Sequence, residues 1–290
     1  MKRVLILGAS GFVGSALKAH LTVPRFAVET VSMRGDDWQK RNFAGADAAV
    51  MAAGIAHRTT EGLSPDEAGE YWRVNALLPF EAAKKAKMEG VRQFIFLSSM
   101  SVYGKEGGVF CPEVIDRVTE PAPVTLYGKS KLEAEKRLSE LSDDGFHVAC
   151  LRPPMIYGPG CKGNYPLLAK AAGMLPFFPD MGNKRSMLYI GTLCRAAEAL
   201  IESGEGGLFF PRNREDVDVA QLVRLIALSH QKNIRLTKAF NAPIRLLSGR
   251  SEKLRKVFGS LVYDENLPTG YTGDEETLEE TVRVTEGAAR

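Results

Sequence analysis

The first half of this chain alternates short apolar runs with segments of helical periodicity, and this alternation restricts its possible folds more than any other feature. The apolar runs are 3–8, 27–33, 47–54, 92–99 and 147–153. Such runs are typical of strands that are buried on both faces of a parallel sheet. The helical segments between them are 12–21, 69–89 and 126–141. The alternation therefore predicts an α/β fold, a doubly wound parallel sheet with right-handed crossovers.

The pattern changes after residue 153, where a stretch rich in proline and glycine begins. Helices are expected beyond it at 167–174, 192–203 and 219–231. We divide the chain into a sheet domain, 1–153, and a smaller C-terminal domain, 154–290, with part of 184–205 returning to the first domain. The second domain is expected over the carboxyl edge of the sheet, where open α/β sheets bind ligands.

Composition excludes several classes of protein. The 290 residues carry a net charge of +3, and we find no block of like charge that indicates a nucleic acid or a membrane surface as partner. No stretch approaches the roughly 18–20 apolar residues of a membrane span. The four cysteines form no CxxC pair and the four histidines are scattered, so neither a disulfide framework nor a metal site is expected. These features favour a cytoplasmic protein that acts on a small molecule.

A glycine-rich loop follows the first expected strand. The sequence GASGFVG (8–14) lies between this strand and the first expected helix. In that context glycines allow a tight turn and close approach of the backbone to a pyrophosphate, and the helix N-terminus offers free N–H groups. The alternative is a glycine-rich turn with no ligand. The loop predicts a dinucleotide site made by Gly8, Ser10, Gly11, Phe12, Val13 and Gly14.

The end of the second expected strand bears on which dinucleotide binds. Enzymes that use NAD usually have an acidic residue there for the ribose hydroxyls. Here Arg34 comes first, and Asp36 follows only after Gly35. Arg34 can pair with a 2′-phosphate, which favours NADP. NAD is the alternative if Asp36 binds the ribose.

Tyr127 and Lys131 lie four residues apart in the expected helix 126–141, on the face that also carries Ala134 and Leu138. A cation beside a tyrosine lowers the pKa of the phenol, and such a tyrosine can act as general acid or base. The alternative is that Lys131 runs its stem along the apolar face and ends in solvent. Periodicity alone leaves both open.

Seven motifs in this order resemble the extended short-chain dehydrogenase/reductase family, the nucleotide-sugar epimerases, dehydratases and reductases. Besides the glycine loop they are AAGIAH (52–57), YWRVNALLPFEAAKKA (71–86), FIFLSSMSVYG (94–104), YGKSKLEAE (127–135), LRPPMIYGPG (151–160) and KRSMLYIGTL (184–193). The resemblance covers nearly the whole chain and implies a Rossmann domain that binds NAD(P) and a C-terminal domain that binds substrate. The most similar branch is short and serves polysaccharide synthesis.

The resemblance also assigns roles to residues. Ser99 would hydrogen-bond the reacting oxygen, Tyr127 exchange its proton, and Lys131 hold the nicotinamide ribose. Further cofactor contacts are implied for Ala52, Ala53, Gly54, Asn75, Pro153 and Pro154. Substrate contacts are implied for Met100, Ser101, Tyr103, Asn164 and Arg185, the last two at a pyrophosphate. His57 and Cys161 are expected in the cleft wall, without a catalytic role.

The implied chemistry is hydride transfer at carbon 4 of a nucleotide-linked sugar, with UDP as the expected nucleotide. Reduction of a 4-keto sugar nucleotide is our first expectation, and a UDP-hexose 4-epimerase with tightly bound NAD is the alternative. A dehydratase is disfavoured because Met100 and Ser101 replace its acidic pair. A non-enzymatic dinucleotide sensor or scaffold is a further alternative. Relatives also suggest a homodimer through the helices at 69–89 and 126–141.

Overall fold

The computed structural model describes residues 1–290 except 23, 57–61, 110, 272, 274–275 and 288–290. Its main feature is a six-stranded parallel sheet in the order β11-β6-β4-β3-β1-β2. The strands are β1 (Lys2–Leu7), β2 (Phe26–Val31), β3 (Ala48–Met51), β4 (Gln93–Leu97), β6 (His147–Leu151) and β11 (Gly207–Phe209). The α/β fold with its doubly wound parallel sheet is confirmed.

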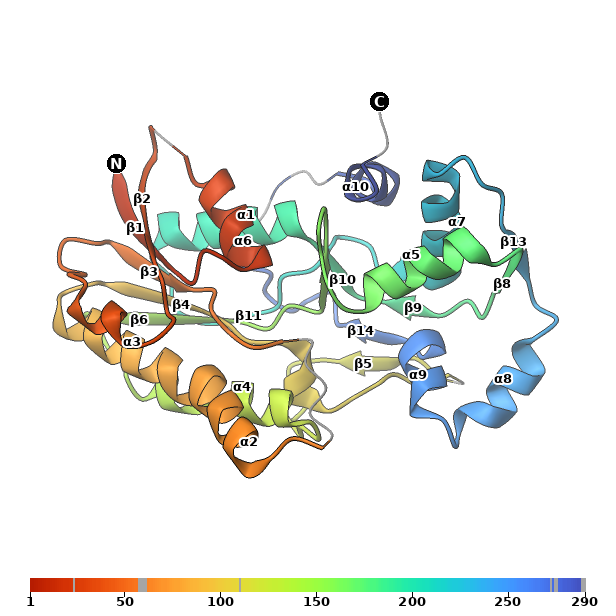
Figure 1. Ribbon diagram of the computed structural model, residues 1–290, viewed down its shortest axis with the longest axis horizontal. Helices are drawn as coiled ribbons and strands as arrows, with labels where there is room; N and C mark the ends of the chain where they lie inside the picture. The colour runs from red at the N-terminus through yellow and green to blue at the C-terminus, as the bar shows by residue number, and fades with distance from the viewer. Residues whose placement is uncertain (23, 57–61, 110, 272, 274–275, 288–290) are drawn as a thin grey trace.

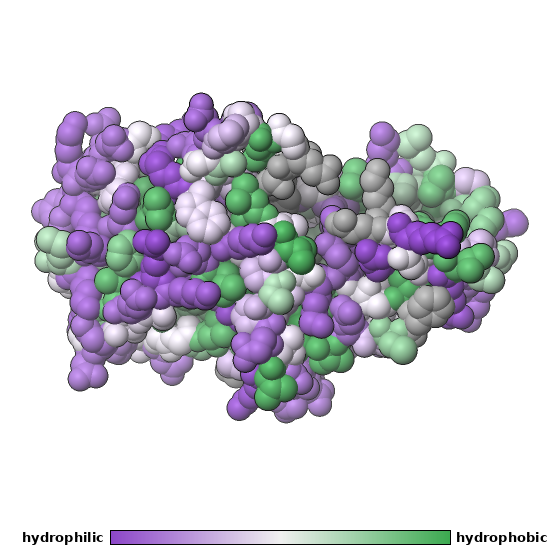
Figure 2. Space-filling view, turned by 90° about the horizontal axis from the view of Figure 1, so that it is seen from below, coloured by the Kyte–Doolittle hydropathy of each residue, from purple (hydrophilic) through white to green (hydrophobic). Residues whose placement is uncertain are grey.

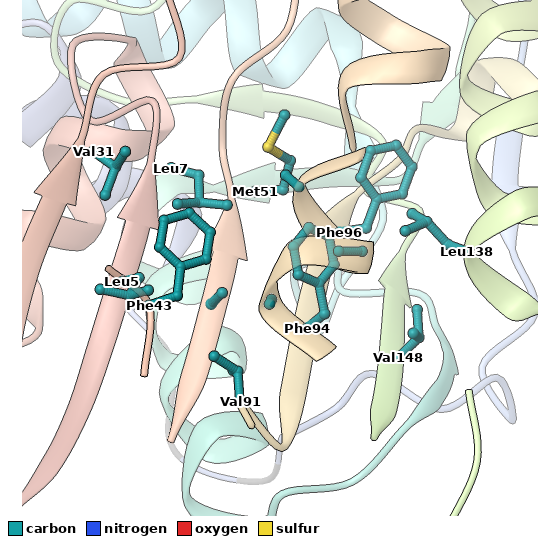
Figure 3. Close-up of a cluster of buried hydrophobic side chains, with 14 of the residues drawn as sticks. Leu5, Leu7, Val31, Phe43, Met51, Val91, Phe94, Phe96, Leu138 and Val148 are labelled. Carbon is teal, nitrogen blue, oxygen red and sulfur yellow. The ribbon is translucent and has the colours of Figure 1, made fainter. Parts of the chain in front are cut away.

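Helices cover both faces of this sheet (Figure 1). They are α1 (Phe12–His20), α3 (Leu78–Met88), α4 (Leu126–Ser139) and α6 (Ile190–Ser203). Alternate residues of β1 explain why its apolar run is continuous. Leu5 and Leu7 point to the α3–α4 side, where Figure 3 shows them in one cluster with Phe94, Phe96 and Leu138. Val4 and Ile6 belong to the cluster on the α1–α6 side.

The expected helix 69–89 is interrupted. It consists of α2 (Pro65–Trp72), the π turn η2 (Arg73–Leu77) and α3. Single π turns inside helices are frequent at functional sites. Two 3₁₀ turns, η1 (Asp37–Lys40) and η3 (Met100–Tyr103), follow β2 and β4. The strand β11 was not anticipated, because its three residues are too few to give a periodicity signal.

The C-terminal part holds smaller sheets with orders β12-β9-β14-β5, β10-β7 and β13-β8. Its strands are β5 (Glu113–Ile115), β7 (Met155–Tyr157), β8 (Phe177–Pro179), β9 (Lys184–Arg185), β10 (Met187–Tyr189), β12 (Val217–Asp218), β13 (Arg235–Thr237) and β14 (Leu261–Tyr263). Its helices are α5 (Asn164–Met174), α7 (Val219–Ser229), α8 (Asn241–Ser248), α9 (Glu252–Phe258) and α10 (Leu278–Thr285). Helix α6 packs beside α1, and β11 pairs with β6, so part of the chain after residue 153 completes the sheet layer.

Among the described helices, none is both long and apolar enough to cross a bilayer. In the same described part of the chain, no three His, Cys, Asp or Glu side chains are grouped as a metal site requires.

Candidate functional site

The glycine loop has the geometry that a dinucleotide requires. Gly8 has φ +95°, and a Cβ on it would lie 2.6 Å from the Cβ of Ala53. Gly11 is the N-cap of α1, and no side chain caps the helix there. The space beside Gly11 is open, since the nearest atom to a Cβ placed on it would be the carbonyl oxygen of Gly8, at 3.9 Å. The first N–H groups of α1 are therefore open to an anion. The loop residues that we assigned to the cofactor fit this group.

Arg34 and Asp36 are both exposed beyond the end of β2, which pairs with β1 beside the glycine loop. Among the described residues no acidic side chain pairs with Arg34, whose backbone N–H contacts the hydroxyl of Ser32 at 3.4 Å. The guanidinium is thus available to a phosphate, and Asp36 remains available to a ribose. The preference for NADP stays a prediction.

The turn after β3 is fixed by two sets of hydrogen bonds. The N–H groups of Ala52 and Ala53 both donate to the carbonyl of Leu7, each at 2.9 Å. Asn75, fully buried in η2, donates from Nδ2 to the carbonyl of Ile55 at 2.9 Å and accepts from the N–H of Ile55 at 2.8 Å. Asn75 thereby holds the backbone just after Gly54. His57 lies outside the described residues.

Ser99 and Tyr127 approach each other where α4 begins. Ser99 caps η3 by accepting from the N–H of Ser101 at 3.1 Å. A Cβ on Gly128 would lie 2.4 Å from the carbonyl oxygen of Ser101, so only glycine lets α4 come this close to η3. Burial is the larger influence on Tyr127 and raises the pKa of its phenol to about 12. The hydrogen bond between Ser99 and Tyr127 acts in the opposite direction and lowers this pKa.

Lys131 is buried below Tyr127. Its ammonium donates to the carbonyl of Leu97 at 2.8 Å and lies 4.6 Å from the ring centroid of Phe96. The centroid of the Tyr127 ring is 5.9 Å away. Burial lowers the pKa of Lys131 to about 8, against the opposing effect of Glu135. The alternative in which Lys131 ends in solvent is excluded, since the residue is only 4% exposed.

The expectation that Lys131 lowers the pKa of Tyr127 stays a prediction. Burial is the largest influence on the phenol, and Ser99, rather than Lys131, opposes it. The ammonium directs its hydrogen bond to Leu97 instead of to the phenol oxygen.

A buried ion pair beneath the site was not found from the sequence. Glu135 lies one helical turn after Lys131, and the guanidinium of Arg152 donates to its carboxylate from Nε at 3.0 Å and from Nη2 at 2.6 Å. The Ser98 hydroxyl also donates to this carboxylate. Interaction with Glu135 raises the pKa of Arg152 against the effect of burial. The only indication of this ion pair in the sequence was Glu135 itself, an acidic residue four positions after Lys131 on the inward face of the expected helix.

Tyr103 and Tyr157 are both buried, in different places. The hydroxyl of Tyr103 accepts from Nη1 of Arg152 at 2.7 Å, so Tyr103 belongs to the buried ion-pair network. A substrate contact for Tyr103 stays a prediction. Tyr157 stacks on Tyr165 in the C-terminal core, with ring centroids 5.4 Å apart. Neither tyrosine lies beside a lysine as Tyr127 does.

The remaining residues that we predicted to contact cofactor or substrate lie either near Ser99, at the carboxyl edge of the sheet, or in the C-terminal part. Met100 is partly exposed, and its N–H donates to the carbonyl of the buried Pro153 at 2.9 Å. Pro154 is also buried, whereas Asn164 is exposed at the start of α5. Cys161 is partly buried, and burial raises the pKa of its thiol.

Arg185 is largely enclosed by backbone carbonyls. It donates from Nε to Gly259 at 3.0 Å and from Nη2 to Arg255 at 3.2 Å and to Glu106. Burial lowers the pKa of Arg185. Arg255 also lines a pocket of about 350 Å³, together with Gly108, Cys111, Glu113 and the end of α8. A phosphate at Arg185 stays a prediction, because these bonds already occupy two of its nitrogens.

Comparisons with known proteins agree with this geometry. Residues 4–209 match the model of the NAD dependent epimerase/dehydratase family. UDP-glucose 4-epimerase from Vibrio cholerae is 29% identical, with 91% of this chain and 87% of the relative covered. GDP-6-deoxy-D-mannose reductase from Pseudomonas aeruginosa is 25% identical, with coverage of 89% and 88%. The solved structure of RMD from Pseudomonas aeruginosa with NADPH has a TM-score of 0.72 at 21% identity and covers 99% of this chain and 98% of its own.

Proposed function

This chain belongs to the NAD dependent epimerase/dehydratase family, and we propose that it reduces a 4-keto sugar nucleotide for polysaccharide precursor synthesis. Its relatives include both epimerases and reductases of sugar nucleotides, so it is an NAD(P)-dependent enzyme of that broader class. We propose UDP as the nucleotide, which the epimerase relative uses by its name.

The observation that carries the proposal is that Ser99, Tyr127 and Lys131 come together at the start of α4. Ser99 hydrogen-bonds the phenol of Tyr127, and the ammonium of Lys131 lies 5.9 Å from the centroid of its ring. A phenol held in this way can exchange a proton with the oxygen at carbon 4, as reduction of a ketone requires. Ser99, which hydrogen-bonds the same phenol, is positioned to contact the same substrate oxygen.

In the proposed reaction, Tyr127 donates its phenolic proton to the carbonyl oxygen at carbon 4. The nicotinamide group, when bound, supplies the hydride that forms the new C–H bond. Ser99 hydrogen-bonds the developing alkoxide. The ammonium of Lys131, 5.9 Å from the centroid of the Tyr127 ring, stabilises the phenolate that remains. Solvent then returns a proton to Tyr127.

We propose NADP rather than NAD as the cofactor. The support is Arg34, an exposed guanidinium at the end of β2 with no acidic partner among the described residues. A guanidinium suits a 2′-phosphate because it offers paired donors in one plane.

The second candidate is a UDP-hexose 4-epimerase that retains NAD. The higher identity to an epimerase, 29% against 25% for the reductase, favours it. A sensor or scaffold without activity is less well supported, because such a protein would have no need to bring Ser99, Tyr127 and Lys131 together.

We also propose a homodimer through α2, α3 and α4, following the family resemblance. The outer face of these helices carries exposed charges such as Lys84 and Lys136, so the contact would be polar. Sedimentation that shows only monomer at micromolar concentration would reject the dimer.

Cofactor content tests the proposed function. The purified protein is heat-denatured and the released nucleotides are identified by chromatography. We expect no stoichiometric NAD, together with saturable binding of NADPH to the untreated protein, because a reductase must exchange its cofactor in each turnover. One NAD released per chain would instead support the epimerase and reject the reductase.

A further inference from the structure

The part of the molecule formed by the end of α5, β8, β13 and α8 exposes several large apolar side chains. Leu246 is 81% exposed and Leu247 is 55% exposed, both on α8. Four more exposed apolar residues come from nearby segments, namely Met174, Leu175, Phe177 and Phe240. Figure 2 shows green apolar side chains mixed with purple ones at the right-hand end of the molecule, the end where Figure 1 places α8, β8 and β13. Folding has left these side chains in contact with water.

Strand pairing, a ring contact and a hydrogen bond connect β8, β13 and α8 on this part of the surface. Strand β8 pairs with β13, and the rings of Phe177 and Phe240 stack with centroids 5.2 Å apart. Asn241, the first residue of α8, donates from Nδ2 to the carbonyl of Asp180 at 2.8 Å. We call these six apolar residues, with the exposed cations Arg235, Lys238, Arg245 and Arg250 among them, the α8 surface.

Local charge distinguishes this surface from the rest of the chain. Residues 232–256 include eight of the 38 Lys and Arg residues but one of the 35 Asp and Glu residues. The segment therefore carries a net charge of +7, and the remainder of the chain carries −4. The whole-chain value of +3 conceals this block, which our sequence analysis did not recognise.

The cations of the α8 surface are free to meet a partner. Within the part of the chain that the structure describes, no acidic side chain pairs with Arg235, Lys238, Arg245 or Arg250. The ion pairs of the described residues lie mainly around the sheet, as those of Glu29 and Glu198 do. A partner with negative charge is therefore complementary to this surface.

The chemistry of the surface selects among partners. A symmetric contact with a second copy would place the same cations of both chains against each other, which opposes association. A nucleic acid would satisfy the cations but would leave the aliphatic side chains of α8 unused. An anionic lipid bilayer satisfies both, because apolar side chains enter the interfacial region while cations remain at the headgroups.

We propose that the α8 surface docks this protein on the surface of a membrane that contains anionic phospholipids. The docking is peripheral and needs no spanning helix. The pocket of about 350 Å³ is lined in part by Ser248, the last residue of α8, and by Gly249, which follows it, so the docked face adjoins this pocket. The inference does not depend on whether the reaction is a reduction or an epimerisation.

Vesicle flotation tests the proposal with the full-length protein. Vesicles contain either phosphatidylcholine alone or equal parts of phosphatidylcholine and phosphatidylglycerol. We expect wild-type protein to float with the anionic vesicles at low salt, to float weakly with neutral ones, and to be released at high salt because screening weakens the attraction. No flotation with anionic vesicles, or equal flotation with both kinds, would overturn the proposal.

Two variants remove the two halves of the surface. Arg245→Glu with Arg250→Glu reverses two charges, and Leu246→Asp with Leu247→Asp removes the apolar contact. Each is expected to lower the fraction bound by roughly tenfold or more. Both should retain wild-type turnover of a water-soluble sugar nucleotide and a wild-type melting temperature, because these side chains are exposed.

Matched controls lie outside both the α8 surface and the proposed dimer contact. Lys18→Glu with Arg92→Glu reverses two exposed charges, on α1 and just before β4, and Val118→Asp alters a residue that is 81% exposed. These variants should float as wild type does. Equal loss in the controls, or wild-type flotation of both α8 variants, would reject the α8 surface as the docking site. A dimer that Leu246→Asp with Leu247→Asp dissociates would show that a second copy is the partner.

Discussion

The start of α4 and the α8 surface both place cations beside apolar side chains, but with opposite consequences. Lys131 is 4% exposed, and its ammonium bonds a carbonyl and faces the ring of Phe96. On α8, Leu246 is 81% exposed and Arg245 beside it is also exposed. Burial changes the pKa of a cation and fixes its position, whereas exposure keeps it charged and available. The first arrangement suits chemistry and the second suits association.

The largest expected effect follows from removing the proton donor at the start of α4. Tyr127→Phe should lower kcat for 4-keto reduction by roughly 10²–10⁴-fold, because a positioned general acid contributes about that much. Steady-state consumption of NADPH measures the effect. The matched control is Tyr157→Phe, since the hydroxyl of Tyr157 bonds Thr281 and Asn213 in the C-terminal core. Equal kcat for the Tyr127 variant and wild type would refute the role of Tyr127.

The buried ion pair beneath α4 should dominate stability. Arg152→Met leaves the carboxylate of Glu135 buried without its partner, and we expect the free energy of unfolding to fall by about 3–5 kcal/mol. Urea denaturation measures this change. The double variant Arg152→Met with Glu135→Leu removes both charges and should recover much of the loss. A single variant as stable as the double one would contradict this account of the pair.

Lys131 predicts a pH dependence in both activity and stability. Its pKa is lowered from 10.5 to about 8, so kcat/KM should fall as pH rises through 8 and the ammonium loses its proton. Between pH 8 and 10.5 the unfolded state binds more protons at Lys131 than the folded state does, so this residue makes stability rise with pH in that window. The cost of burying the cation is fully present below pH 8.

The variant Lys131→Met separates this effect from other titrations. It should lose the rise in unfolding free energy between pH 8 and 10.5, which urea denaturation at several pH values measures. A rise that is identical in wild type and variant would mean that another group causes it.

The smallest expected effect concerns cofactor choice. Arg34→Ser should raise KM for NADPH by roughly tenfold and leave KM for NADH unchanged, because one charge-assisted contact to the 2′-phosphate is lost. Arg92→Ser is the control, since Arg92 is exposed just before β4 and pairs with Asp47. An equal rise in KM for NADPH and NADH would indicate that Arg34 does not contact the 2′-phosphate.

Local patterns predicted much of the fold and the centre of the site. Three signals each depend on only a few neighbouring residues and could be recognised in the sequence. They are the apolar runs that form β1, β3, β4 and β6, the glycine loop, and the spacing of Tyr127 and Lys131. The pairing of Glu135 with Arg152 could not be predicted in this way, because it joins residues 17 apart across a helix and a strand. The π turn at η2 contains Asn75, whose bonds to Ile55 join segments 20 residues apart, and helical periodicity does not predict such a contact.

The α8 surface was missed for a different reason. A net charge averaged over the chain does not reveal where charges are concentrated, and helical periodicity does not reveal which helices lack a covering layer. Only the folded structure shows that Leu246 and Leu247 remain exposed among the cations of residues 232–256. Charge counted over short windows could have found the basic half of this signal.

Transfer of deuterium tests the central claim, a net reduction at carbon 4, most directly. The enzyme is given a UDP-4-keto sugar and NADPH that carries deuterium at the transferred position, and the product is analysed by mass spectrometry and NMR. We predict one deuterium at carbon 4 for each NADPH oxidised, and loss of the product with Tyr127→Phe. A product that forms from a UDP-hexose by inversion at carbon 4, without deuterium and without consumption of NADPH, would contradict the account.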